Sequence, residues 1–270
     1  MRINRYLCPF AWVGLAGLLS SPLWAASPQP AHVTQIANDV QLLDPVAAAR
    51  PALLNDEVGD GIVMRTGKDS RAELTFSDGM VVRLAAATDF SFRNGRRDLN
   101  LGEGAVLVQA SKKAKGAKIH AAGAAAAITG TTVMFEYHPG VCKFLVLEGT
   151  GRLYRPGHLG DSVLVRPGQM VIGNPSSPLS DPVDFDIGRF VKTSRFVVDL
   201  PPLASDKAMA QESQKQQREK SKKSLIDTNL VIFGGGTLVS LVDPAQLKAE
   251  PAKPAPSPAA TPVPEAAPLQ

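Results

Sequence analysis

One cysteine and one histidine have the types and the spacing of a catalytic pair. Cys142 follows His138 by four residues, with a Pro-Gly turn between them. A nucleophilic thiol needs a neighbouring base and an exposed, electropositive setting. Cys142 instead alternates with Phe144 and Val146, which places it on the apolar side of a strand. We therefore expect a buried structural cysteine and assign no catalytic residue.

The histidines of the chain do not suggest a metal centre. No two of them have a ligand spacing such as His-x-x-x-His, and no cluster of carboxylates accompanies them. A zinc site needs three or four ligands that converge in space. We expect neither a metal nor a cofactor at these residues, which are His32, His120, His138 and His158.

A glycine run near the C-terminus looks at first like a phosphate-binding loop. Gly234–Gly236 follows the apolar run Leu230–Phe233. A phosphate loop must open a helix and carry a lysine near its end, because the helix N-terminus binds the anion. Here the next run, Leu238–Val242, has the composition of another strand. The glycines are better explained as the connection of a hairpin.

Four lysines form a small basic cluster, made of Lys112, Lys113, Lys115 and Lys118. Nucleic-acid binding would need aromatic residues between them for stacking, and the cluster has none. The chain has 29 Lys and Arg, and removing the two in residues 1–25 leaves 27 against 25 Asp and Glu. We expect a solvated loop and no nucleic-acid partner, with contact to an anionic cell-envelope polymer as an alternative.

Paired carboxylates would indicate an enzyme that acts on a polysaccharide or on peptidoglycan. The acids available on strand-like runs are Glu73, Glu136 and Glu148. Each of them alternates with apolar neighbours, so we expect all three on a solvent-facing side. An envelope enzyme is therefore the alternative to a binding protein, and carboxylates that lie far apart would argue against it.

The first 25 residues have the layout of a secretory signal peptide. Arg2 and Arg5 precede an uncharged apolar run, Leu7–Leu19, and a small-residue exit follows at Ala25. The apolar run is shorter than the ~20 residues that a membrane span needs. We expect a mature chain that begins at Ala26, has no transmembrane helix and is periplasmic or secreted. The other cysteine of the chain leaves with the leader, so an internal disulfide is not expected.

Composition divides the mature chain into four regions. Apolar residues at helical spacing predict a short helix within residues 26–57. Short apolar runs between turns predict a mainly β domain over 58–174, built as two packed antiparallel sheets or a short β-helix or roll. Residues 175–247 should hold helices, with Asp184 as the first N-cap, and then a β-hairpin. A Pro- and Ala-rich tail, 248–270, should be extended and disordered.

One hairpin of the β domain can be aligned in register. With the three-residue loop Ser77-Asp78-Gly79, Leu74 pairs with Val82 and Glu73 pairs with Arg83. The commoner two-residue Asp-Gly turn would mix buried and solvated faces, because a slip of one residue turns every side chain over. We therefore predict the longer loop, with the apolar pair in the core and the charged pair exposed.

Five short pieces in a fixed order give the chain a family resemblance. Gly67–Phe76, Asp78-Gly79, Gly-Thr-Thr at 130–132, Leu-Glu-Gly at 147–149 and Arg-Pro-Gly-Gln at 166–169 together resemble the FecR domain. The resemblance places the alanine run 121–127 in a strand that enters the Gly-Thr-Thr piece. It implies a set of structural motif residues, which are Gly67, Asp78, Gly79, Gly130, Thr131, Glu148, Gly149, Pro167 and Gly168.

The resemblance also implies a role in the cell envelope. FecR domains are known from periplasmic parts of proteins that relay signals between the outer envelope and a sigma-factor system. We expect a non-catalytic exported protein that binds an envelope protein through a strand edge or a loop, as a scaffold or signalling module. Direct regulation of a sigma factor is not the role that we expect.

Overall fold

The computed structural model describes residues 30–93, 97–112, 116–219 and 225–226. Strands make up 47% of the described residues and helices make up 13%, so the prediction of a mainly β fold is confirmed. The predicted signal peptide, the hairpin around the glycine run and the Pro- and Ala-rich tail all lie outside the described residues.

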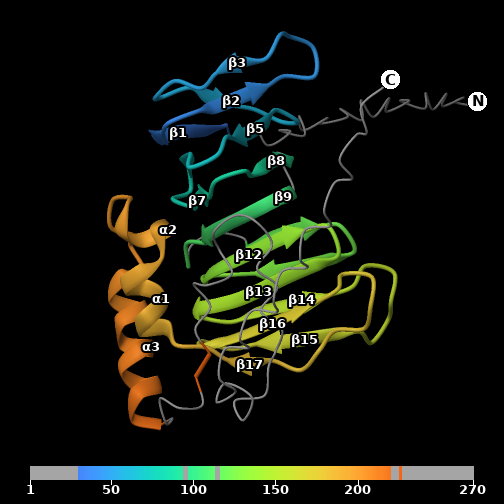
Figure 1. The fold of residues 1–270 in the computed structure, drawn as a ribbon, viewed down its shortest axis with the longest axis vertical. Helices are drawn as coiled ribbons and strands as arrows, with labels where there is room; N and C mark the ends of the chain where they lie inside the picture. Colours follow the sequence, from blue (N-terminus) through green and yellow to red (C-terminus); the bar gives the residue numbers. More distant parts are fainter. Residues whose placement is uncertain (1–29, 94–96, 113–115, 220–224, 227–270) are drawn as a thin grey trace, which may run out of the picture.

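The strands form two packed sheets that share one strand (Figure 1). The first, sheet A, contains in spatial order β4 (Glu57–Val58), β1 (Ala31–Ala37), β6 (Arg71–Phe76), β7 (Val81–Leu84), β9 (Asp98–Gln109), β12 (Thr132–His138), β13 (Val141–Glu148), β16 (Gln169–Gly173) and β17 (Val183–Asp184). Sheet B contains β3 (Arg50–Pro51), β2 (Val40–Leu43), β5 (Val63–Thr66), β8 (Asp89–Arg93), β9, β10 (Ala117–Ala121), β11 (Ala124–Ile128), β14 (Gly151–Tyr154) and β15 (Ser162–Val165). The alanine run 121–127 spans the end of β10, a turn at Ala122 and Gly123, and most of β11, and β11 leads into the Gly-Thr-Thr piece as the resemblance implied.

Strand β9 joins the two sheets at a glycine corner. Its first half pairs with β8 and β10 in sheet B, and its second half pairs with β7 and β12 in sheet A. Gly104 lies at the change and has a φ of 93°. A Cβ there would lie 2.3 Å from Thr88 Oγ1 and 2.6 Å from the Ala87 carbonyl oxygen. The corner therefore requires glycine, for its conformation and for its space.

Successive hairpins alternate between the sheets, so the domain is a roll. Hairpins β6–β7, β12–β13 and β16–β17 belong to sheet A, whereas β10–β11 and β14–β15 belong to sheet B. Their inward side chains make an apolar core, which includes the edge-to-face pairs Phe76–Phe92 and Phe135–Phe144. Within the described part of the chain, every strand pair is antiparallel except β9 with β10.

The predicted register of the β6–β7 hairpin is confirmed. Leu74 pairs with Val82 and Glu73 with Arg83. The Phe76 and Met80 backbones close a three-residue loop, and Gly79 has a φ of 79°. Leu74 and Val82 are fully buried, as predicted.

The helix predicted within residues 26–57 is wrong, because this segment forms strands β1 to β4. A β-bulge at Thr34 explains the error, since the pairing with β6 shifts between Val33 and Gln35. Because of the bulge, the inward side chains of β1 are Ala31, Val33 and then Ile36. The three-residue step from Val33 to Ile36 resembles the spacing of a helix.

Three helices cover the outer face of sheet A: α1 (Ile187–Thr193), α2 (Arg195–Val198) and α3 (Asp206–Glu219) (Figure 1). A second apolar cluster joins Phe190, Phe196 and Met209 of the helices to outward residues of sheet A such as Leu107 and Met134. We call residues 185–219 the helical cap. Asp186, and not the predicted Asp184, is the N-cap of α1, because its side chain accepts a hydrogen bond from the Arg189 amide.

Candidate functional site

Eight of the nine motif residues lie in the turns at one end of the sheets. Strand ends meet there, since Gln109 pairs with Val81 and with Thr132, and Thr132 pairs with Glu148. The ninth, Gly67, lies at the opposite end, where its carbonyl accepts a hydrogen bond from the Ala87 amide. The eight residues at what we call the motif end are Asp78, Gly79, Gly130, Thr131, Glu148, Gly149, Pro167 and Gly168.

The contacts of the motif residues tie the turns to one another. The Thr131 carbonyl accepts a hydrogen bond from the Ala110 amide at 2.8 Å. Glu148 accepts one from Thr132 Oγ1 at 3.4 Å and lies 3.5 Å from the Lys112 ammonium. Asp78 caps its own hairpin through the Met80 amide and forms an ion pair with Arg97. These contacts hold the end of the roll together and assemble no reactive group.

A groove of about 500 Å³ lies between the motif end and helix α3. Turn residues such as Gly149 and Pro167 form one wall, and α3 forms the other. The charges along it have both signs, from Arg166, Lys215, Glu212 and Glu219. The groove therefore shows no preference for a ligand of one charge.

Gln216 of α3 connects the motif end to the start of α1. Its buried amide accepts a hydrogen bond from the Ile187 amide at 3.2 Å and donates one to the Phe185 carbonyl at 2.7 Å. The Gly168 amide and carbonyl bond to Val146 and Phe185. A Cβ on Gly168 would lie 2.5 Å from the Gln216 side-chain nitrogen. The absence of a side chain at this motif position thus makes room for the cap.

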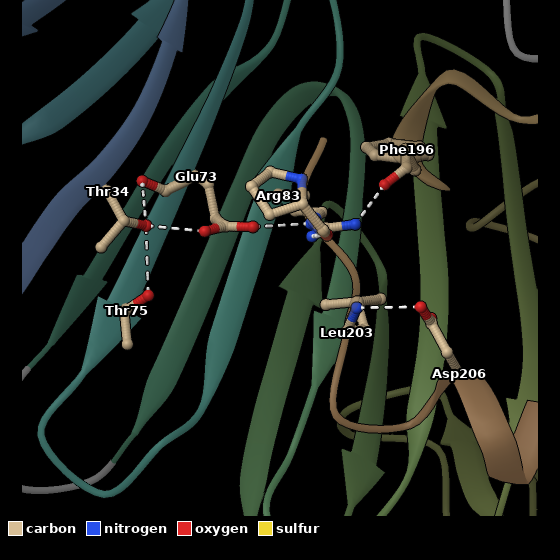
Figure 2. Close-up of polar contacts among 8 residues, drawn as sticks. Thr34, Glu73, Thr75, Arg83, Phe196, Leu203 and Asp206 are labelled. Atoms are coloured by element: carbon tan, nitrogen blue, oxygen red, sulfur yellow. Dashed lines mark hydrogen bonds and ion pairs between the residues drawn. The ribbon is translucent and has the colours of Figure 1, made fainter. Parts of the chain in front are cut away.

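A buried arginine holds the middle of the cap on sheet A (Figure 2). Arg83 Nε donates to Glu73 at 2.8 Å, and its other nitrogens donate to the carbonyls of Phe196, at 2.5 Å, and Pro201. Thr34 Oγ1 donates to the second Glu73 oxygen at 2.8 Å. The prediction that Glu73 and Arg83 form an exposed pair is therefore wrong, because Arg83 is 1% exposed beneath the cap.

A second buried ion pair lies on the same face of sheet A. Lys143 Nζ is 2.5 Å from Glu136, and the other oxygen of Glu136 is 3.2 Å from His138 Nε2. Burial lowers the pKa of Lys143, and the charge of Glu136 opposes this shift. The hydrogen bond with Glu136 is the main cause that raises the pKa of His138, and desolvation opposes it. Glu136 thus contacts both Lys143 and His138.

The three strand acids are buried and dispersed, which corrects the expectation that they face solvent. Glu73 and Glu136 lie on strands separated by β7 and β9, which is about 14 Å at the spacing of strands in a sheet. Glu148 pairs with Thr132 of β12. Thr132 is four residues along β12 from Glu136, which is about 13 Å at the rise of a strand. Glycosidase carboxylates lie about 5–9.5 Å apart. These acids therefore cannot act as such a pair.

Cys142 is buried, as predicted, with 3% of its surface exposed. Desolvation raises the pKa of its thiol to about 11. Cys142 pairs with Tyr137 and packs in the core between the sheets, whereas His138 occupies the next position, which faces the other way. The two side chains do not form a nucleophile and base.

The remaining predicted chemistry does not converge on a site. Within the residues that the structure describes, no three His, Cys, Asp or Glu side chains are placed to hold a metal ion. Of the lysine cluster, Lys112 pairs with Glu148 and Lys118 lies exposed on β10, whereas residues 113–115 are not described. No helix of the described ranges is long and apolar enough to span a membrane.

The buried polar contacts of the cap are what the sequence analysis missed. Their signal was present in sheet A, where bulky apolar residues such as Leu107 and Met134 share one face with Glu73, Arg83 and Lys143. A solvent-facing side would not hold so many large apolar side chains. A mixed face of this kind indicates a cover, although it does not identify the segment that supplies it.

Comparison with known proteins supports the family resemblance. Residues 62–150 match the family model described as FecR protein, so the FecR domain expected from the sequence is confirmed for this part of the chain. No curated protein matches the chain. Two crystal structures of a protein from Parabacteroides distasonis, described as a "putative anti-sigma factor", are similar at 14% identity and a TM-score of 0.42. They match 48% of this chain, which spans 65% and 64% of their length.

Proposed function

We propose that this protein is an exported, non-catalytic FecR-domain protein of the cell envelope. It binds a protein partner and acts as a scaffold or a signalling module. The match of residues 62–150 to the FecR family carries this proposal. The dispersed acids and the buried Cys142 support a non-catalytic role, and no observation favours the alternative of an envelope enzyme.

The partner is expected at the edge of sheet B that β15 forms. The cap covers the outer face of sheet A. At the β17 edge of sheet A, Ile226 forms a bridge with Phe185 and so extends the sheet there. At the other edge of sheet B, β3 carries Pro51, which cannot donate a ladder hydrogen bond. Among the residues that the structure describes, strand β15 forms a ladder with β14 alone, and Leu164 is 38% exposed. An extended segment of a partner can add to such an edge.

Site-specific photocrosslinking in the native host tests this proposal. A photoreactive residue replaces Leu164 on β15, and the control carries it at Val198 on α2, which is 53% exposed. We expect one adduct of discrete mass in the envelope fraction with the Leu164 probe and none with the Val198 probe. A Ser162→Lys change beside the probe should remove this adduct, since an edge lysine opposes strand addition. Equal adducts from both probes, or protein confined to the cytosol, would contradict the proposal.

Export has its own test in the mass of the mature protein. We expect intact mass spectrometry of the envelope form to give a chain that begins at Ala26. A mass that retains residues 1–25 would contradict cleavage and would instead favour an anchored protein.

A further inference from the structure

A small cavity lies between helix α2 and the end of sheet A opposite the motif end. Its volume is about 200 Å³. The FecR domain contributes one wall, and Arg195 and Phe196 of α2 contribute the other. At about 30 Å³ for each water, the cavity has room for roughly seven waters or a molecule of a few heavy atoms. A cavity of this size is too small for most cofactors.

The cavity is lined by small and apolar residues on its inner side. Ala85–Ala87 come from the connection between β7 and β8, and Gly104 and Ala105 come from the corner of β9. Phe196 of α2 also lines the cavity. Such a surface favours a short hydrocarbon segment over a fully hydrated ion.

The charged residues that line the cavity are mainly cationic. Lys68, Arg71 and Arg195 outnumber Asp69 among the lining side chains. Arg71 and Arg195 both bind Asp199, at 3.0 and 2.9 Å, and Arg195 also lies 3.9 Å from Asp69. A guanidinium has five N–H donors in a planar fork, which suits further acceptor oxygens.

One of these donors lacks an acceptor. The Arg71 side chain is 11% exposed, and its Nε has no hydrogen-bond partner within the described ranges. A buried N–H without an acceptor is costly, so a shift of the Arg71 side chain that brings Nε to an acceptor oxygen of a ligand would be favourable. His138 also lines the cavity, and its neighbours Glu136 and Glu103 lie 3.2 and 3.7 Å from its ring nitrogens. Lys143 neutralises Glu136, whereas Glu103 faces the His138 ring and has no lysine or arginine paired with it in the described ranges.

We propose that this cavity binds a small carboxylate with a short apolar tail, held between the FecR domain and α2. The carboxylate contacts Arg71 and Arg195, and the tail packs on the alanines and Phe196. Because the Phe196 carbonyl accepts a hydrogen bond from Arg83, a ligand here would also hold the cap on sheet A. This inference does not depend on export or on a protein partner.

Calorimetric titration and thermal unfolding of the full mature chain test the proposal. Sodium butyrate is the probe, and butyramide, its neutral analogue of similar shape, is the control, with sodium chloride holding ionic strength constant. We expect saturable heat and a higher unfolding temperature with butyrate, and neither with butyramide or inorganic phosphate. Equal effects of butyrate and butyramide, binding of phosphate alone, or no effect of butyrate would overturn the proposal.

Three variants locate the site. Arg195→Gln removes one cation, and Ala86→Leu fills the cavity without changing a charge. Both should weaken butyrate binding at least tenfold while their unfolding without ligand stays cooperative. Arg152→Gln, exposed on β14 of sheet B, should leave the affinity unchanged. Unchanged affinity in both cavity variants would place the butyrate elsewhere and overturn the assignment.

A peptide probe identifies the source of the carboxylate. A short acetylated peptide with a free C-terminal carboxylate and an alanine end is titrated beside butyrate. Tighter binding of the peptide would support a chain terminus as the natural ligand, and tighter binding of butyrate would support a free carboxylate.

Discussion

At the scale of single residues, the charges beneath the cap distinguish this molecule from a bare β roll. Arg83 and Lys143 are 1% and 2% exposed, and each of them has a carboxylate within 2.8 Å. A buried ion pair adds little net stability, yet removal of one partner leaves a costly unpaired charge. The Arg83–Glu73 pair therefore behaves differently from the exposed pair that the sequence predicts.

Substitution of Arg83 tests this difference. Arg83→Met should lower the free energy of unfolding by about 3–5 kcal/mol, because Glu73 and two carbonyls lose their donor. The control Arg65→Met breaks an exposed pair with Asp89 and should cost about 0–1 kcal/mol. Urea denaturation measures both variants. If both cost the same, or if Glu73→Gln does not offset the loss in the double variant, the pair is not buried as described.

His138 gives the molecule a stability that depends on pH. Its pKa is raised in the folded state, chiefly by the hydrogen bond with Glu136. The proton therefore binds the folded chain more tightly than the unfolded one. This stabilisation is fully present below the unfolded pKa of about 6.5 and is lost as pH rises through the raised folded value.

The variant His138→Gln should accordingly lose more stability at pH 5.5 than at pH 8.5, with urea denaturation as the measurement. His120→Gln is the control, on the outer face of sheet B, and its effect should be small. A His138→Gln penalty that is constant across this range would contradict the role of the charged imidazole.

Gly130 tests a motif position directly. It has a φ of 59°, in the left-handed region, and a Cβ there would lie 3.1 Å from Lys112 Cγ. Gly130→Val should cost about 1–3 kcal/mol in thermal unfolding, because a β-branched residue is strained in this region. Gly173→Val is the control, since a Cβ there would contact nothing and no positive φ is involved. Equal losses of stability in the two variants would contradict a special backbone geometry at Gly130.

At the scale of elements, the β6–β7 hairpin is the part that the sequence specifies best. The alternation of apolar and polar residues in β6, together with Arg83 between Val82 and Leu84, sets the register, because the opposite choice would bury the wrong faces. Leu74→Ala should cost about 2–5 kcal/mol, since Leu74 is fully buried between the sheets. Ser91→Ala on β8, whose side chain faces outward, should change stability little. A small loss for Leu74→Ala in urea denaturation would contradict its place in the core.

The elements that sequence reasoning misread have identifiable physical causes. A single bulge at Thr34 changes the phase of β1, so its inward residues imitate a helix. The outward face of sheet A is misread for another reason, because its cover comes from α1 to α3, about a hundred residues later in the chain. Periodicity within one strand reports which side chains share a face, but it does not report what lies against that face.

At the scale of the whole molecule, local composition and long-range packing determine different features. The mainly β class, the turns and the positions of the helical region follow from residue types and spacing. The joining of two sheets through β9 and the cavity beside α2 depend on contacts between distant segments. The candidate site is made of such contacts, and this is why the sequence indicates its motif turns but not its cap.

The molecule has two apolar cores, one between the sheets and one under the cap, and they differ in how many apolar side chains they bury. The core between the sheets is continuous and apolar, whereas α3 contributes Met209 as its one buried apolar side chain and otherwise buries Ser213 and Gln216. Regions with few buried apolar contacts open at lower free energy than the rest of a protein. The cap should therefore open as a separate cooperative unit while the roll stays folded.

Hydrogen exchange of two matched variants tests this division. Phe190→Ala weakens the core under the cap and Phe135→Ala weakens the core between the sheets, and both side chains are fully buried. Each change should lower the free energy of unfolding of the region that contains it by about 3–5 kcal/mol. Phe190→Ala should speed exchange in α1 to α3 and leave the amides of β10 and β11 protected, whereas Phe135→Ala should speed exchange throughout. The same exchange pattern in both variants would mean that the cap and the roll unfold as one unit, and that the cap is not held separately by Arg83 and Gln216.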